Sequence, residues 1–146
     1  MSNVNEQLTM TGHLQIRLND ELVRDVPNLV VTAGKGFVAT RMIGTGAGVM
    51  SHMEVGTGTT DPAAGNTTLE SAVSSSRTAF TSSAAVSGAV VTYITAFAAG
   101  TGTGALTEAG IFNASSNGTM LCRTEFSVVN KGAADTMTIT WTVTVS

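Results

Sequence analysis

Charged residues, aromatic residues, histidine and cysteine are all scarce in this chain of 146 residues. Asp, Glu, Lys and Arg make up 12% of it, about half the usual fraction, so much of the surface is expected to be neutral. The net charge of −3 comes without a basic stripe, which excludes the electrostatic footprint of a nucleic-acid-binding protein. A neutral surface of small residues suits packing against another protein.

The shortage of cysteine and histidine limits the chemistry that the chain can perform. Cys122 is the only cysteine, so no intramolecular disulfide can form, and its apolar neighbours predict a buried thiol. His13 and His52 each lack a second ligand at a metal-binding spacing. There is no Gly-x-Ser-x-Gly motif, and neither glycine-rich segment, 33–36 or 100–104, has the surroundings of a phosphate-binding loop. We therefore predict no enzymatic activity, no cofactor and no metal ion.

The carboxylates are scattered, and only Glu108 and Glu125 lie within strongly patterned apolar segments. A catalytic acid or base needs a positioned partner, which the sequence does not indicate. A buried glutamate must be paired or hydrogen-bonded. We therefore interpret Glu108 as a structural residue, with Arg77 or Arg123 as its partner.

Long apolar runs are also missing from the chain. No segment approaches the length of a membrane span, and Met1 leads into the polar run Ser2 to Gln7 rather than into a secretory signal. The sequence thus predicts a protein without a membrane partner that is made and folded in a cytoplasm.

The clearest pattern that is present covers residues 135–146, where apolar and threonine side chains alternate. A period of two places the apolar side chains on one face of a strand and the threonines on the other. Other segments of the chain must pack against that apolar face. Its members are Met137, Ile139, Trp141, Val143 and Val145.

The remaining segments predict more strands separated by turn residues. The pattern favours an all-β fold with about eight strands and one short helix, arranged as a two-sheet antiparallel, jelly-roll-like sandwich. Residues 1–7 form a flexible N-terminal arm, and 8–146 form a single domain. Besides 135–146, strands are expected at 13–18, 22–31, 50–55, 77–86, 89–97, 106–112 and 119–129, and a helix at 32–42 capped by Thr32.

Specific pairings and loops are also predicted. Residues 13–18 and 22–31 form an opening hairpin, in which Pro27 marks an edge or a bulge. The segments 119–129 and 135–146 form a closing hairpin. Ser87-Gly88 forms a turn, and residues 57–68 and 99–104 form exposed loops.

Several stretches together resemble small structural proteins of tailed bacteriophages. They are Asn28 to Lys35 (NLVVTAGK), Met50 to Thr60 (MSHMEVGTGTT), Thr107 to Asn113 (TEAGIFN) and the threonine-alternating end of the chain. The chain is similar to head decoration, or cement, proteins, and a related pattern occurs in phage tail-collar fibre proteins. It has no collagen-like repeat, coiled coil or shaft-like repeat, which favours the decoration protein.

The resemblance implies a non-enzymatic virion protein that binds the outer surface of the head and stabilises it. Its partners would be the major capsid protein and further copies of itself, as a homodimer or homotrimer, after synthesis in the host bacterial cytoplasm. We expect the interface on the N-terminal arm and on the loops 57–68 and 99–104, for the sole reason that these segments are expected to be exposed. The candidate interface residues are Asn3, Val4, Asn5, Thr59, Thr60, Asp61, Pro62, Thr101 and Thr103.

Two alternative functions stay open at this point. A structural module of the tail fibre or baseplate would share the motifs but would be present in few copies per virion. A host-surface carbohydrate-binding or hydrolytic domain would instead need a cleft with exposed aromatic side chains or paired carboxylates.

Overall fold

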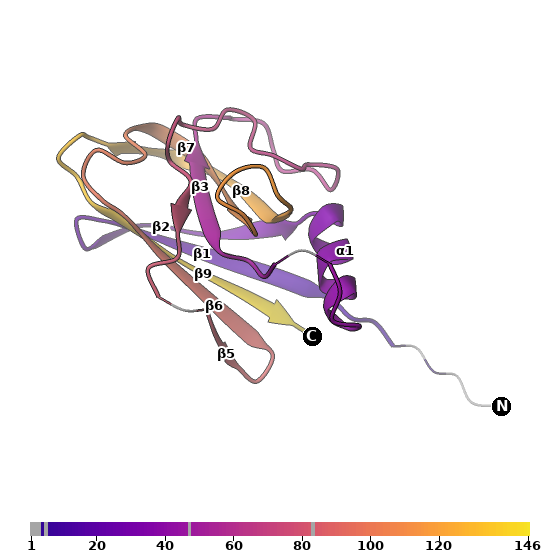
Figure 1. Cartoon of the computed structure of the whole chain (residues 1–146). Helices are drawn as coiled ribbons and strands as arrows, with labels where there is room; N and C mark the ends of the chain where they lie inside the picture. The colour runs from indigo at the N-terminus through magenta and orange to yellow at the C-terminus, as the bar shows by residue number, and fades with distance from the viewer. Residues whose placement is uncertain (1–3, 5, 47, 83) are drawn as a thin grey trace.

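The computed structural model describes residues 4, 6–46, 48–82 and 84–146. This part of the chain contains nine antiparallel strands and one helix, which confirms the predicted all-β class (Figure 1). The strands are β1 (Met10–Leu18), β2 (Glu21–Val30), β3 (His52–Gly56), β4 (Thr78–Ala79), β5 (Ala85–Ser87), β6 (Val90–Phe97), β7 (Gly104–Phe112), β8 (Met120–Lys131) and β9 (Met137–Val145), and the helix is α1 (Thr32–Arg41).

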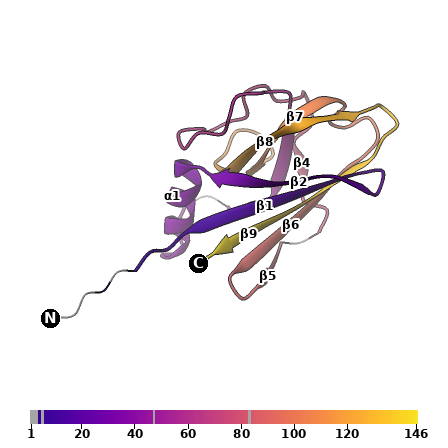
Figure 2. The same cartoon turned by 180° about the vertical axis from the view of Figure 1, so that it is seen from behind.

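The strands follow the order β4-β3-β7-β8-β2-β1-β9-β6-β5 in one sheet that curls on itself (Figures 1 and 2). Strand β2 joins the two halves, because most of it pairs with β1 while Leu29 and Val30 pair with β8. The far ends of the sheet meet where the Thr81 amide donates to the Ile94 carbonyl of β6 at 2.9 Å. The curled sheet thereby encloses one main core, and its likeness to a jelly roll stays a prediction.

The core is centred on β9, as the alternating pattern predicts. Trp141 is fully buried, and its register partners are Leu14 of β1 and Tyr93 of β6. The indole Nε1 donates to the Asn28 side chain at 3.1 Å. That side chain occupies the space where a Cβ at Gly12 would lie, so glycine at this position lets a polar partner reach the buried indole.

The opening hairpin is confirmed, whereas the predicted closing hairpin is wrong. Strands β1 and β2 pair through a turn at Asn19 and Asp20, both of which have positive φ. Pro27 lies in the part of β2 that pairs with β1 alone. Strands β8 and β9 do not pair with each other, because both edges of β9 are taken along almost their whole length by β1 and β6.

The predicted strand at 77–86 is also wrong, because the chain crosses there from one half of the sheet to the other. Its first residues form β4, which pairs with β3, and its last residues form β5, which pairs with β6. The predicted hairpin turn after it is confirmed, since Gly88 has a φ of +59° between β5 and β6.

Helix α1 lies close to its predicted range, but Thr32 is not its cap. The N-cap residue is Val31, without a side-chain cap, and the Thr32 amide donates to the Ala64 carbonyl of a distant loop at 2.8 Å. The helix lies against β8 at Gly34, where a Cβ would overlap the Leu121 carbonyl. A glycine is therefore required for this close approach.

Candidate interaction surface

The segment between β3 and β4, residues 57–77, covers the outer face of β7 and β8, and we call it the long loop. Its Leu69 packs with Val31, Phe112 and Met120 in a second apolar cluster, separate from the main core. A register shift in β7 between Leu106 and Glu108 turns Glu108 away from the main core. From Glu108 to Phe112, β7 is buried on both faces.

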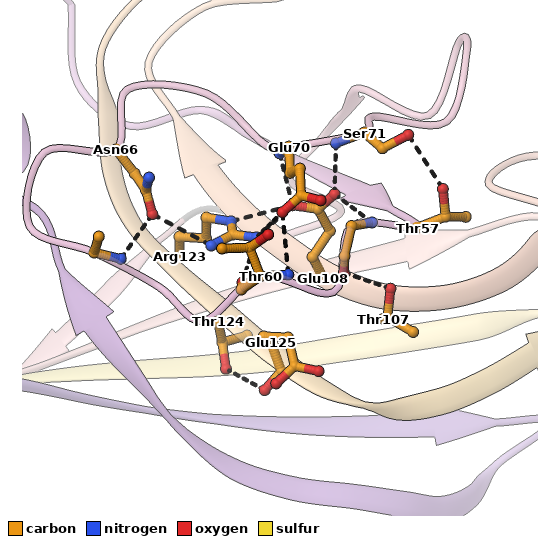
Figure 3. Close-up of polar contacts among 12 residues, drawn as sticks. Thr57, Thr60, Asn66, Glu70, Ser71, Thr107, Glu108, Arg123, Thr124 and Glu125 are labelled. Carbon is orange, nitrogen blue, oxygen red and sulfur yellow. Dashed lines mark hydrogen bonds and ion pairs between the residues drawn. The ribbon is translucent and has the colours of Figure 1, made fainter.

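Glu108 fixes both limbs of the long loop to β7 (Figure 3). It is fully buried. Its Oε2 accepts from the amides of Gly58 at 2.7 Å and Ser71 at 2.8 Å, and its Oε1 accepts from the Glu70 amide at 2.9 Å. Oε1 also accepts from Nε and Nη2 of Arg123 at 3.1 and 3.0 Å. The predicted structural role of Glu108, with Arg123 as its partner, is confirmed.

Arg123 extends the same clamp from β8 to the tip of the long loop (Figure 3). Its guanidinium donates to the Thr60 carbonyl at 3.0 Å and to the Asn66 side-chain oxygen at 3.2 Å. The Asn66 oxygen also accepts from the Ala63 amide at 2.8 Å. A buried carboxylate and a buried guanidinium thus add to the few backbone hydrogen bonds that the long loop makes, such as that from the Thr57 amide to the Ser71 carbonyl.

The other predicted partner of Glu108, Arg77, has a different role. Its Nε lies 3.2 Å from Glu54 Oε2, and its guanidinium carbon lies 3.7 Å from the centre of the Phe112 ring. Arg77 therefore packs on Phe112 of the second apolar cluster and pairs with Glu54 of β3.

The predicted interface residues of the long loop are held at the surface. Thr59, Thr60 and Asp61 are exposed, and Pro62 is half-buried. The Thr60 amide donates to Glu70 Oε2 at 3.0 Å. Hydrogen bonding from Thr60, helped by the charge of Arg123, lowers the pKa of the Glu70 carboxyl, and desolvation opposes this shift.

The glycine loop, residues 99–104, lies beside the base of the long loop. Thr103 is exposed, whereas Thr101 is half-buried. A Cβ at Gly102 would lie 3.8 Å from the Cβ of Ser76 in the long loop. Three residues after the glycine loop, Thr107 Oγ1 of β7 donates to the Gly58 carbonyl at 2.6 Å. Gly102 has a φ of +67°, and a Cβ there would lie 3.0 Å from Val55 of β3. The glycine loop therefore packs at Gly102 against Val55, a residue of the main core.

Lys131 supports the glycine loop from the end of β8. Its ammonium group donates to the Ala98 carbonyl at 2.9 Å and to the Asp135 carbonyl at 2.7 Å. Desolvation lowers the pKa of Lys131, and the negative charge of Asp135 opposes that shift.

The N-terminal arm lies at the other end of the molecule. Strand β1 begins at Met10 opposite Val145, whereas the glycine loop follows Phe97, which pairs with Met137. The length of β9 separates these ends by roughly 27 Å. Val4 is exposed, and the predicted interface residues Asn3 and Asn5 lie outside the described residues. The arm therefore starts far from the glycine loop, whereas the long loop lies beside the start of α1, where the Thr32 amide donates to the Ala64 carbonyl.

The sequence indicated the buried pair but not the residues that complete the clamp. Asn66 and Glu70 belong to a polar, turn-rich stretch with no periodicity, so only tertiary contacts assign their roles. The Cys122 thiol is fully buried, as predicted, and desolvation raises its pKa well above the ordinary value.

Comparison with protein-family models, with curated proteins and with solved structures found no match to this chain. Among the described residues, no group of His, Cys, Asp and Glu side chains is arranged to hold a metal ion. In the same part of the chain, no helix has the length and apolar character needed to cross a membrane.

Proposed function

We propose that this chain is a structural protein of a tailed bacteriophage virion, a decoration protein that binds the outer surface of the head and stabilises it. The observation that carries the proposal is the long loop, which presents exposed threonines while a buried ion pair attaches it to β7 and β8. The resemblance of the sequence to head decoration proteins supplies the identity of the partner, the major capsid protein.

A pre-organised loop is suited to repeated, shape-specific binding. Ordering a loop of this length on contact would cost conformational entropy, about 1 to 2 kcal/mol for each residue fixed. The contacts of Glu108 and Arg123 make that ordering part of folding. Binding can then use neutral surface without a large entropic cost.

Stabilisation of a shell follows from mass action. A protein that binds the assembled shell better than its dissociated subunits shifts the equilibrium toward the shell. Many copies, each adding a modest contact, give a large total effect. Salt screens exposed ion pairs and would weaken a contact that depends on them. A clamped and largely neutral loop makes a contact that does not depend on such pairs.

The copy number per virion tests the proposal against its alternative, a tail-fibre or baseplate module. Quantitative mass spectrometry of purified virions would compare this chain with the major capsid protein. We expect one copy, or a simple fraction of one, per capsid subunit. A few dozen copies or fewer per particle would overturn the head assignment and favour the tail.

A binding assay on shells that lack the chain tests the surface. Purified protein would be sedimented with such shells, and the bound fraction measured for Thr59→Arg and for Ser87→Arg. Both positions are exposed hydroxyl residues, one on the long loop and one on the edge strand β5. We expect at least tenfold weaker binding for the first only. Equal binding by both variants would contradict the role of the long loop.

A further inference from the structure

An apolar groove of about 450 Å³ runs along one side of α1, between the helix and the start of β1. Its helical wall carries Lys35, Val38, Ala39 and Met42, which are spaced so that they form one stripe along the helix. Leu8 and Met10 form the opposite wall. Met42 and Leu8 expose 85% and 74% of their surface, so the stripe is largely uncovered within one copy of the chain.

The last residues of the N-terminal arm, from Glu6 on, lead away from the body at this groove (Figures 1 and 2). Thr9 is its last anchored residue, because its amide donates to the Ser146 carbonyl at 2.6 Å and its carbonyl accepts from the Ser146 amide at 2.8 Å. Beyond Thr9, Val4 is 82% exposed, and Glu6 is exposed as well.

We propose that this groove binds the N-terminal arm of a second copy of the same chain. In an extended arm, Val4 and Glu6 lie on one face, because alternate residues of a strand share a face. This face is apolar at one end and acidic at the other, whereas Leu8 stays in the wall of its own groove. The groove offers an apolar stripe with one cation, Lys35, at its end. The two surfaces are therefore complementary in both polarity and charge.

The dimensions of the two surfaces also agree. The segment from Val4 to Gln7, which precedes the groove-lining Leu8, spans about 10 Å when extended. The helical stripe from Lys35 to Met42 spans about 10 Å. Covering the stripe would bury Val4 and Met42, two of the most exposed large apolar side chains among the described residues.

Chain direction favours a second copy over the arm's own body. To enter its own groove, the arm would have to fold back beside Leu8, which already forms one wall of that groove. An arm from a two-fold related copy needs no such turn, since each arm can leave its own groove and enter the partner's. The exchange is thus a symmetric contact between identical surfaces.

This inference goes beyond the proposed function and does not depend on it, because its test needs only the purified chain. Three variants, each with one cysteine added to the native Cys122, would be made: Val4→Cys, Met42→Cys and, as a control on the edge strand β5, three strands away from β1, Val86→Cys. All three positions are exposed in one copy of the chain. The native Cys122 is fully buried, so it should stay out of the exchange.

The variants would be mixed in pairs, oxidised and analysed by non-reducing electrophoresis and mass spectrometry. We expect a disulfide-linked heterodimer from Val4→Cys with Met42→Cys, and at least tenfold less from Val4→Cys with Val86→Cys. A disulfide forms only where the two Cα atoms come within about 7 Å. Equal yields from both pairs would overturn the proposal. So would a double variant, Val4→Cys with Met42→Cys, that closes only within one chain.

A charge exchange provides an independent test. Analytical ultracentrifugation would measure the dimer dissociation constant of the native chain, of Lys35→Glu, and of Lys35→Glu combined with Glu6→Lys. Lys35 and Glu6 are both exposed, so neither change threatens folding. We expect the single variant to dimerise about three- to fivefold more weakly and the double variant to recover. A monomeric native chain at all concentrations, or no recovery, would overturn the proposal.

Discussion

The substitution Glu108→Gln separates the ion-pair clamp from the rest of the fold. Glutamine keeps the shape of the side chain but replaces one carboxylate oxygen with an NH2 group. If its remaining oxygen faces Arg123, the NH2 group faces the amides of Gly58 and Ser71, which now have no acceptor. The variant therefore places donor against donor in a buried site.

The expected cost follows from these contacts. Two unsatisfied buried donors cost about 1 to 3 kcal/mol each. Breaking a buried ion pair by removing one charge costs about 3 to 5 kcal/mol. We therefore expect Glu108→Gln to lower the free energy of unfolding by about 3 to 5 kcal/mol. That is a large share of the roughly 5 to 15 kcal/mol of a typical domain.

Urea unfolding monitored by the fluorescence of Trp141 would measure this loss. With a slope of about 2 kcal/mol per molar urea, the midpoint should fall by roughly 1.5 to 2.5 M. Hydrogen exchange gives a local readout, since the amides of Gly58, Glu70 and Ser71 donate to this carboxylate. Their exchange should accelerate more than that of β9 amides.

Glu125→Gln is the matched control. Glu125 is the register partner of Glu108 on β8, but it is only half-buried. The same chemical change there should alter stability by no more than about 0.5 kcal/mol. A loss below about 1 kcal/mol for Glu108→Gln, or equal losses for the two variants, would refute the clamp as the main anchor of the long loop.

Three further predictions concern the core, the turn before β9 and the thiol. Gly12→Ala should lower the thermal midpoint of unfolding, because the new Cβ would overlap the Asn28 side chain. Gly36→Ala should raise the midpoint slightly, because it lies within helix α1 with open space around it. A higher midpoint for Gly12→Ala than for Gly36→Ala would contradict this reasoning. Hydrogen bonding from Asn19 lowers the pKa of Asp135 from its usual 3.8. The ionised carboxylate therefore stabilises the fold above pH 3.8, and this stabilisation is lost as the pH falls through the pKa of Asp135 in the folded state. The stability difference between the native chain and Asp135→Asn should therefore shrink below pH 3.8, and a constant difference in acid unfolding curves would argue against it. Cys122 should react with a thiol reagent only on unfolding, because burial raises its pKa, and rapid labelling of the native chain would disprove this.

The sequence by itself determined the class of fold and the centre of its core. The alternation in β9 requires a buried face, and Trp141 is fully buried there. The turn residues at Asn19 and Asp20 fix the opening hairpin. Glu108 in an apolar strand had to be paired, because a buried unpaired carboxylate is too costly. These are local requirements, so local sequence patterns are enough to reveal them.

Only the tertiary structure decided which strands are neighbours and how the interaction surface is built. Strands β8 and β9 follow each other in sequence, yet β9 pairs with β1 and β6, because strand pairing depends on which edges the whole chain leaves available. The choice of Arg123 over Arg77 as the partner of Glu108 likewise follows from register across β7 and β8. The groove beside α1 brings residues at the start of β1 next to residues of the helix, and no periodicity within either segment predicts that these two segments are neighbours.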